Sequence, residues 1–225
     1  ALDLCLHDLP VRLIANGGGV VYAPLGPTHL ATEDLAILRA LPNMTIIAPC
    51  DAEEMKRLMA ETLDYPHPIY IRLAKGGDKV VSLEENGFTI GKAIVIKNPK
   101  DCLFVTTGVM TQVALQACNI LNQENISCGV MHMHTIKPLD NEALNHWIPK
   151  VKSVVSVEEH TRIGGLGSAV LEFCSDAMPE QASKIKRIGF PDRFADQYGN
   201  QNSLLNHWGI TAEKLSETMR NSLNN

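Results

Sequence analysis

The feature that most constrains the fold is a regular alternation of short apolar runs with amphipathic stretches. The apolar runs are rich in Val, Ile and Leu, and many are bounded by Gly, Pro or Asp, as is typical of strands buried in a parallel sheet. They occupy residues 11–15, 44–48, 69–73, 102–106, 128–133, 153–158 and 185–188. Between them, apolar residues recur at helical spacing, for example from Met110 to Asn122. Strands that alternate with single helices predict parallel sheets with right-handed crossovers, so we expect an α/β fold.

A stretch of loop-forming residues divides this alternation into two units. Residues 77–92 contain Gly, Asp, Ser and Asn, which favour turns over regular structure. We therefore expect one α/β unit over residues 1–76, a linker over residues 77–92, and a second α/β unit over residues 93–225. Within these units, Asp51 and Asp140 precede helical patterns and have the chemistry of helix N-caps.

The composition and charge limit the classes of function. The chain has 225 residues with 45% hydrophobic content, which is enough for one large or two modest cores. Its formal net charge of −5 argues against nucleic acid or an anionic membrane as the main partner. No apolar run reaches the length of about 18 residues that a membrane span needs. The six cysteines lack the spacing of metal sites or disulfide frameworks, so we expect buried thiols in a cytoplasmic protein.

One loop of the first unit carries the residues best suited to chemistry. Three consecutive glycines, Gly17–Gly19, follow the strand expected at residues 11–15, and Gly-Pro-Thr-His comes shortly after them at residues 26–29. Loops after the carboxyl ends of strands are where ligands bind in open α/β sheets. Thr28 and His29 are therefore candidate functional residues, although a loop histidine is more often a capping or solvated side chain.

Motifs along the chain resemble those of one enzyme family. Gly-Pro-Thr-His at 26–29 and Leu-Pro-Asn-Met-Thr at 41–45 are similar to the second half of the pyrimidine-binding domain of transketolase-like, thiamine-diphosphate-dependent enzymes. Ile-Lys-Pro-Leu-Asp at 136–140, Val-Glu-Glu-His at 157–160 and Gly-Gly-Leu-Gly at 164–167 resemble the transketolase C-terminal domain. The motifs follow the family's order and span nearly the whole chain. Similar runs occur in transketolases, deoxyxylulose-phosphate synthases and the β subunits of 2-oxo-acid dehydrogenases.

The resemblance sharpens the expected fold. It implies two parallel-sheet α/β units, of which the first is an incomplete pyrimidine-binding domain and the second is a transketolase C-terminal domain. The chain would begin inside the pyrimidine domain, after the half that carries the family's cofactor-activating glutamate and the aromatic residues that stack on the pyrimidine. We therefore expect a fragment, either a natural subunit or a truncated piece, with an exposed sheet edge and apolar faces that favour pairing with another copy.

The resemblance also assigns roles to site residues. His29 would lie near the reacting carbons as the catalytic hydrogen-bond donor, with Thr28 beside it as a substrate-binding residue. Lys75, just after the strand expected at 69–73, matches an arginine that holds the substrate phosphate in sugar-phosphate transketolases, although a solvated strand-end lysine is an equal alternative. Leu25 and Gly17 replace an aspartate and a histidine of those enzymes. The pocket would then be more apolar, and the substrate would differ from an ordinary pentose or heptose phosphate.

Two other groups are weaker candidates. The glycine-rich loop at 158–167 precedes a helical pattern and could cradle an anion with its backbone amides, but we favour glycines that let helix and strand approach closely. His132 and His134 would share one face of a strand, as a metal pair needs, yet no third ligand at useful spacing is evident. We therefore expect no metal site in this chain.

By resemblance, the complete enzyme would transfer a two-carbon ketol unit between sugar or sugar-phosphate substrates, using thiamine diphosphate and Mg²⁺. We expect this chain to be inactive alone, to bind no cofactor, to dimerise through its C-terminal domain, and to need an N-terminal diphosphate-binding half or subunit. Three alternatives remain open: a 2-oxo-acid dehydrogenase β subunit, a deoxyxylulose-phosphate-synthase-like enzyme, and a non-catalytic dimerisation module.

Overall fold

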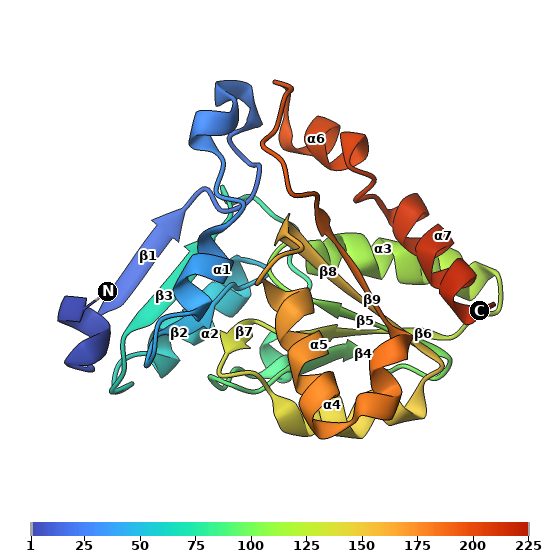
Figure 1. Cartoon of the computed structure of the whole chain (residues 1–225), viewed down its shortest axis with the longest axis horizontal. Coiled ribbons are helices and arrows are strands. Elements are labelled where there is room, and N and C mark those ends of the chain that lie inside the picture. The colour runs from blue at the N-terminus through green and yellow to red at the C-terminus, as the bar shows by residue number, and fades with distance from the viewer. Residues whose placement is uncertain (1, 225) are drawn as a thin grey trace.

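The structure is a computed structural model that describes residues 2–224. Its strands are β1 (Arg12–Asn16), β2 (Thr45–Ile47), β3 (Ile69–Leu73), β4 (Ile94–Lys97), β5 (Cys102–Thr106), β6 (Cys128–His132), β7 (Thr135–Lys137), β8 (Ser153–Thr161) and β9 (Ile185–Phe190). Its α-helices are α1 (Asp34–Arg39), α2 (Ala52–Glu61), α3 (Met110–Gln123), α4 (Asn141–Trp147), α5 (Leu166–Ala177), α6 (Gln201–His207) and α7 (Ala212–Leu223). Two sheets, ordered β1-β3-β2-β7 and β4-β6-β5-β8-β9, lie side by side (Figure 1). The expected α/β fold with two units is confirmed.

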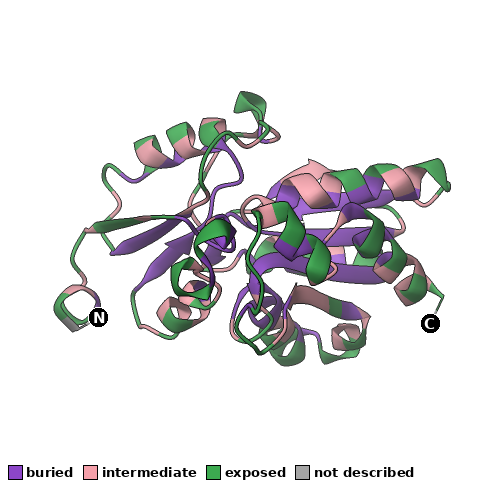
Figure 2. Cartoon of the chain, turned by 90° about the horizontal axis from the view of Figure 1, so that it is seen from above, coloured by how far each residue is buried: buried purple, intermediate pink, exposed green. Residues whose placement is uncertain are grey.

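The second sheet is buried on both faces because successive strand residues point to opposite sides. Phe104 packs with residues of α3, α6 and α7 in one core, whereas its neighbours Leu103 and Val105 pack with residues of α4 and α5 in another. Figure 2 shows these strands buried between helices whose outer faces are exposed. The near-continuous apolar runs seen in the sequence follow from this double covering.

The first sheet is covered at its centre and open at one edge. Ile46 on β2 packs with Leu35 of α1, and its neighbour Ile47 packs with Leu58 of α2. Within residues 2–224, the outermost strand, β1, pairs on one side only, with β3. Its Leu13 and Ile14 are 37% and 51% exposed. An exposed edge strand with apolar side chains is what an incomplete sheet was expected to leave.

Two strands depart from the parallel arrangement that the sequence predicted. β4 pairs antiparallel with β6 at one edge of the second sheet, and β7 pairs antiparallel with β2 at one edge of the first. Only Met133 and His134 separate β6 from β7, which is too short for the crossover that a parallel connection needs. The chain therefore leaves the second sheet and joins the first, so one strand from the expected C-terminal unit belongs to the N-terminal sheet.

Two of the connections are fastened by aspartates. Asp51 caps α2 by accepting from the Glu54 amide at 2.9 Å, and its other oxygen accepts from the amides of Val81 and Ser82 at 2.8 Å each. Asp140 caps α4 by accepting from the Ala143 amide at 3.0 Å. Both N-caps are as predicted. The connection at 77–92 is therefore docked on α2 rather than loose, and its role as a domain boundary stays a prediction.

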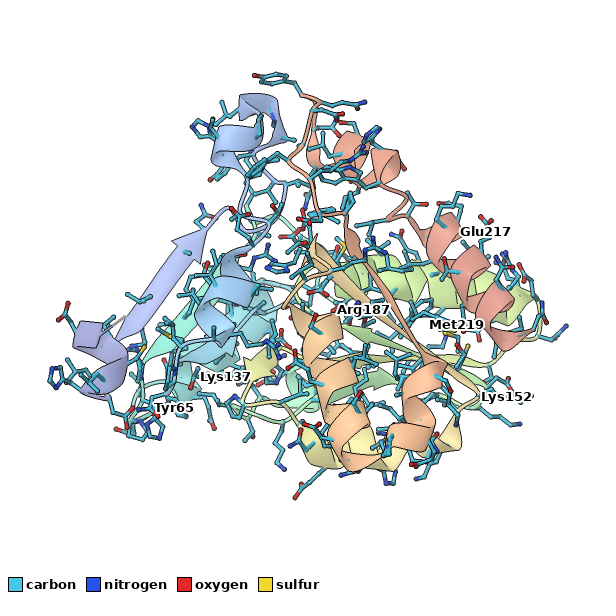
Figure 3. The ribbon with its side chains drawn as sticks, viewed as in Figure 1. Tyr65, Lys137, Lys152, Arg187, Glu217 and Met219 are labelled. Carbon is cyan, nitrogen blue, oxygen red and sulfur yellow. The ribbon has the colours of Figure 1, made fainter. Side chains whose placement is uncertain are left out.

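Lys137 of β7 lies where the two units meet (Figure 3). Its ammonium group donates to the carbonyl oxygens of Arg39 and Leu41, at the end of α1. Among the helices of residues 2–224, none is both long and apolar enough to cross a bilayer.

Candidate active site

The candidate site begins with a turn that glycine and proline define. Two short 3-10 turns, Ala23–Leu25 and Pro27–His29, flank Gly26. Gly26 has a φ of +79°, and a Cβ placed there would lie 2.5 Å from the ring of Tyr198. Both the backbone conformation and the close approach require glycine. The turn is therefore held in one shape against the loop that precedes α6, and the two segments lie near each other in Figure 1.

Thr28 and His29 are exposed at the tip of this turn. The Thr28 hydroxyl lies 2.9 Å from Nδ1 of His29. When that hydroxyl donates to Nδ1, the ring carries its proton on Nε2 and can donate it to a bound group. The imidazole is thus accessible and oriented by its neighbour, which is the arrangement that a hydrogen-bond donor to substrate needs.

The three consecutive glycines make room for side chains that cross the loop. A Cβ on Gly18 would lie 2.5 Å from the Arg72 guanidinium, and one on Gly19 would lie 2.4 Å from the Glu159 carboxylate. The loop backbone is then fixed by Gly19 and Ala31, which exchange hydrogen bonds of 2.8 and 3.0 Å. Close packing therefore requires glycine in this run, and the fixed loop in turn positions the turn that bears His29.

Arg72 is a buried anchor for this loop. Its side chain is 7% exposed, and its guanidinium lies 3.1 Å from the Asp34 carboxylate. It also donates to the carbonyl oxygens of Ala31 and Glu159, at 2.7 and 2.8 Å. These contacts join the two units and hold the guanidinium in place, while its Nε makes no hydrogen bond among the described residues.

The segment Glu158–His160 at the end of β8 reinforces the same junction. Glu159 accepts from the Val20 amide at 2.8 Å and from Gln201 at 2.9 Å, and burial raises the pKa of its carboxyl. His160 accepts from the Ala36 amide in the first turn of α1 at 3.3 Å, while its other nitrogen lies 2.7 Å from the Thr161 carbonyl. Both buried groups hold the first unit on the second.

The glycine-rich loop before α5 already holds an anion from the protein itself. The Glu158 carboxylate accepts from the Leu166 and Gly167 amides at 2.7 and 2.9 Å. Burial raises the pKa of this carboxyl to about 7, although the two amides act in the opposite direction. A Cβ on Gly165 would lie 2.0 Å from the carboxylate, so the glycine permits the close approach. The interpretation of these glycines as structural agrees with this geometry.

Lys75 lies on a cavity at the carboxyl edge of the first sheet. The cavity has a volume of about 420 Å³, and its walls come from the ends of β1, β2 and β3 together with Val109 of the second unit. Asn16, Asp51 and Asp78 are its other polar side chains besides Lys75 and Cys50. An exposed lysine at the mouth of a largely apolar cavity is suited to contact an anionic group of a ligand.

Comparison with protein-family models matches both units. Residues 2–77 match the transketolase pyrimidine binding domain, and residues 91–215 match the transketolase C-terminal domain. The chain belongs to the transketolase family. The family expectation drawn from the motifs is therefore confirmed.

Individual relatives in this family agree with the domain matches. The chain is 33% identical over 218 residues to one of the subunits of apulose-4-phosphate transketolase from Phocaeicola vulgatus, covering 96% of this chain and 68% of that protein. It is 34% identical over 221 residues to 1-deoxy-D-xylulose-5-phosphate synthase 2 of Geobacter sulfurreducens, covering 97% of this chain and 35% of that protein. The chain thus spans about two thirds of one relative and about one third of the other.

Solved structures of transketolases also superpose on this chain. A split-gene transketolase described as an inactive β4 tetramer superposes with a TM-score of 0.88 at 34% identity, covering 98% of this chain and 69% of that one. A transketolase from Pichia stipitis superposes with a TM-score of 0.77 at 19% identity, covering 98% of this chain and 31% of that one, and supports the fold alone.

Within this transketolase-family chain, the predicted site residues do not share one cavity. Lys75 lines the cavity at the sheet edge, whereas Thr28 and His29 lie on the exposed turn. Leu25 is 54% exposed beside them, and Gly17 has a φ of +95° that favours glycine over a histidine. Their roles stay predictions. Sequence reasoning missed Tyr198, whose ring covers Gly26, because no motif marks a contact between segments so far apart.

The expectation that His132 and His134 share one face of a strand is wrong, because β6 ends at His132 and His134 lies in the connection to β7. His132 instead has two neighbours that the sequence did not reveal. Cys50, Glu54 and His132 present donor atoms within 4.8 Å of one another, while His134 is not in this group. Glu54 already accepts from the Cys50 amide and lies 2.8 Å from His132. Burial acts to raise the pKa of Glu54, yet His132 lowers it to about 2. This buried carboxylate–imidazole pair is satisfied within the protein, and its arrangement suits a structural network.

Proposed function

We propose that the chain is the C-terminal portion of a transketolase-type enzyme that transfers a two-carbon ketol unit between sugar or sugar-phosphate substrates. The observation that carries the proposal is the exposed Thr28–His29 pair, on a turn shaped by glycine, in a chain of the transketolase family. His29 is its catalytic residue, Thr28 orients the imidazole and contacts substrate, and Lys75 contacts a phosphate of the substrate.

In this proposal, His29 donates from Nε2 to the substrate oxygen on which negative charge develops. A donor placed at such an oxygen commonly raises turnover by a factor of roughly 10²–10³. Thr28 keeps the imidazole tautomer by donating to Nδ1, across the 2.9 Å contact. Lys75 adds electrostatic attraction for an anionic group at the cavity mouth, without the bidentate geometry of an arginine.

The family cofactor is thiamine diphosphate, which supplies an electron sink for chemistry beside a carbonyl group. The described residues do not by themselves fit a site for it with Mg²⁺, an ion that requires free oxygen ligands. Of the two carboxylates at the cavity, that of Asp51 is already held by the amides of Glu54, Val81 and Ser82, which leaves Asp78 as a single carboxylate ligand. We therefore assign the diphosphate and Mg²⁺ to an N-terminal half or subunit, and we infer that this chain is inactive without it.

The assembly proposed is a homodimer through the C-terminal domain, combined with that N-terminal partner. The exposed edge strand β1, with Leu13 and Ile14, supports a contact that completes the first sheet. All six cysteines are free and buried, which supports a reducing compartment such as the cytoplasm.

His29→Ala in the complete enzyme tests the proposal. We expect turnover to fall at least about tenfold with little change in melting temperature, because the side chain is exposed. His146→Ala, an exposed histidine on α4, is the matched control and should leave turnover unchanged. Turnover that is equal in both variants would remove His29 from the site.

The reaction type is tested separately. A deoxyxylulose-phosphate-synthase-like activity is the second candidate, favoured by the 34% identity to such a synthase. Assaying ketol transfer from a ketose phosphate against condensation of pyruvate with an aldehyde, in which the pyruvate carboxylate leaves as CO2, distinguishes the two. A 2-oxo-acid dehydrogenase β subunit would instead support transfer of the acyl group of a 2-oxo acid to a lipoyl group, and a dimerisation module would show none of these activities.

A further inference from the structure

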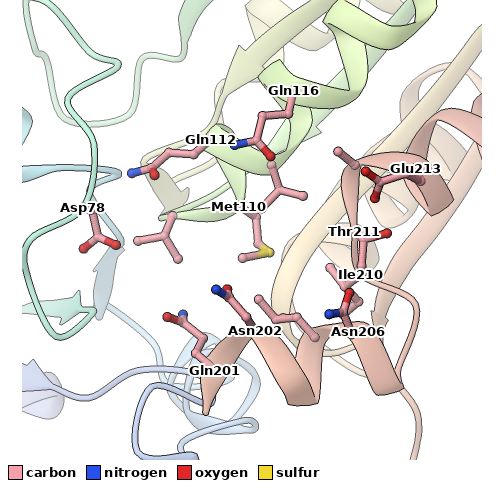
Figure 4. Close-up of a pocket in the computed structure, with 14 residues that line it drawn as sticks. Asp78, Met110, Gln112, Gln116, Gln201, Asn202, Asn206, Ile210, Thr211 and Glu213 are labelled. Carbon is pink, nitrogen blue, oxygen red and sulfur yellow. The ribbon is translucent and has the colours of Figure 1, made fainter.

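A second cavity lies between helices of the C-terminal unit. It has a volume of about 410 Å³ and is formed by α3, α6 and the start of α7 (Figure 4). Met110 and Ile210 belong to its apolar wall. Five side-chain carboxamides surround it: Gln112, Gln116, Gln201, Asn202 and Asn206. A volume of this size is within the range of small-molecule sites, and its carboxamides make the lining more polar than that of most such sites.

Two of the carboxamides donate hydrogen bonds to other protein groups, and three have no such bond among the described residues. Gln112 donates to the Lys79 carbonyl at 2.9 Å, and Gln201 donates to the Glu159 carboxylate at 2.9 Å. Among the described residues, the exposed side chains of Gln116, Asn202 and Asn206 make no hydrogen bond to protein groups and are open to solvent. Each free carboxamide offers one acceptor oxygen and an NH₂ donor group. The cavity therefore presents paired donors and acceptors in a neutral form.

The charges of the lining limit the ligand further. Asp78 and Glu213 are its charged side chains, and none of its lining residues is cationic. Two carboxylates with no cationic side chain beside them disfavour an anion at this place, whereas Lys75 offsets the carboxylates of the other cavity in part. A sugar ring fits instead, because each hydroxyl both donates and accepts and the C–H faces can pack on the aliphatic wall.

This cavity adjoins the one that contains Lys75. Asp78 and Val109 line both of them. A single ligand can therefore have its anionic end at Lys75 and an uncharged part among the carboxamides. We propose that the carboxamide cavity binds an uncharged sugar unit, and that the substrate is a sugar phosphate extended by a second sugar ring. The extension rests on the proposed function, whereas binding of the uncharged sugar does not.

Nuclear magnetic resonance titration of the full chain tests this proposal directly. Side-chain NH₂ signals of Gln116, Asn202 and Asn206 report on their own hydrogen bonds. The probes are trehalose as the uncharged disaccharide, trehalose 6-phosphate as its phosphorylated form, and glucose 6-phosphate as the shorter phosphate. We expect saturable shifts of the three NH₂ signals with trehalose. Trehalose 6-phosphate should bind at least about tenfold more tightly, because Lys75 adds a charge-assisted hydrogen bond.

Variants identify the groups responsible. Asn202→Ala and Gln116→Ala should each weaken trehalose binding about three- to tenfold, the usual effect of one lost neutral hydrogen bond. Gln123→Ala, on the exposed side of α3 outside the cavity, is the matched control and should bind as the wild type does. Lys75→Ala should remove the advantage of the phosphorylated disaccharide and leave trehalose binding intact.

Three results would overturn the inference. They are the absence of saturable shifts with both disaccharides, unchanged trehalose affinity in Asn202→Ala and Gln116→Ala, or equal affinity for trehalose 6-phosphate and glucose 6-phosphate. The last result would reject the extended substrate alone. The proposed function is tested independently by the turnover of His29→Ala, so its failure is distinguishable from failure of the sugar site.

Discussion

Replacing Arg72 with alanine distinguishes a structural role for this guanidinium from a substrate-binding one. The question matters because Arg72 stands three positions before Lys75, the residue that the resemblance matches to a phosphate-binding arginine of sugar-phosphate transketolases. In the structure, Arg72 is 7% exposed and meets three oxygens, those of Asp34, Ala31 and Glu159, at 3.1, 2.7 and 2.8 Å. A structural role predicts lost stability, whereas a ligand role predicts lost activity with stability preserved.

The size of the effect follows from burial. Asp34 is 15% exposed, and one of its carboxylate oxygens already lacks a hydrogen-bond partner. Removing Arg72 leaves this carboxylate with the Tyr70 hydroxyl at 2.7 Å and takes one donor from each of the carbonyls of Ala31 and Glu159. Breaking a buried ion pair in this way costs about 3–5 kcal/mol. Since 1 kcal/mol corresponds to about 2–4 °C for a chain of this size, the melting temperature of Arg72→Ala should fall by about 6–20 °C.

Thermal unfolding followed by circular dichroism measures this change, with urea unfolding as a second estimate. Arg193→Ala removes an exposed arginine and is the matched control, expected to lie within about 0.5 kcal/mol of the wild type. Arg72→Lys should lie between the two because it keeps the charge but cannot reach all three oxygens. A melting temperature for Arg72→Ala within about 2 °C of the wild type would refute the anchor role.

Further predictions concern the same junction and the open sheet edge. Gly19→Ala should destabilise the chain by about 1–3 kcal/mol in urea unfolding, because φ is +75° and the new Cβ would lie 2.4 Å from Glu159; a stability equal to the wild type would contradict the packing. The pKa of Glu158 is raised from 4.5 to about 7, so its stabilising contribution is complete below pH 4.5 and is lost as pH rises to about 7. The stability of the wild type relative to Glu158→Gln should decrease over this window, and a constant difference would exclude the shift. Ile14→Lys should reduce association beyond the proposed C-terminal homodimer in sedimentation velocity, since Ile14 is 51% exposed on β1 of the first sheet, while an unchanged distribution would exclude a contact between copies at that edge.

Much of the fold was predictable because it depends on local patterns. The strand Ile69–Leu73 and the strand Cys102–Thr106 begin and end where the apolar runs do. The caps at Asp51 and Asp140 were readable because an N-cap contact spans only three residues. The antiparallel strands β4 and β7 were not predicted, since their pairing depends on which sheet lies nearby. A run as short as Thr135–Lys137 carries no signal for that choice.

The candidate site was predictable only in part, and for the same reason. Residues 26–29 form a motif that can be recognised along the chain, whereas their supports come from distant segments. Val20 and Glu159 are 139 positions apart, yet their hydrogen bond fixes the loop that presents the turn. The contact of Tyr198 with this turn was likewise not predictable from residue spacing, although its ring lies against Gly26.

The Gly17–Gly19 run is visible in the sequence, but the reason for its glycines is visible only in the structure. Three glycines in a row favour a flexible loop when read locally. In the structure they belong to a crowded junction, where Arg72 from the first unit and Glu159 from the second cross the backbone. A loop that must admit two buried, charged side chains cannot carry side chains of its own at the crossing points. The position of the turn with Thr28 and His29 therefore depends on the contact between the two units. A substitution in the second unit at Glu159 should thus disturb the candidate site without touching any residue of the motif.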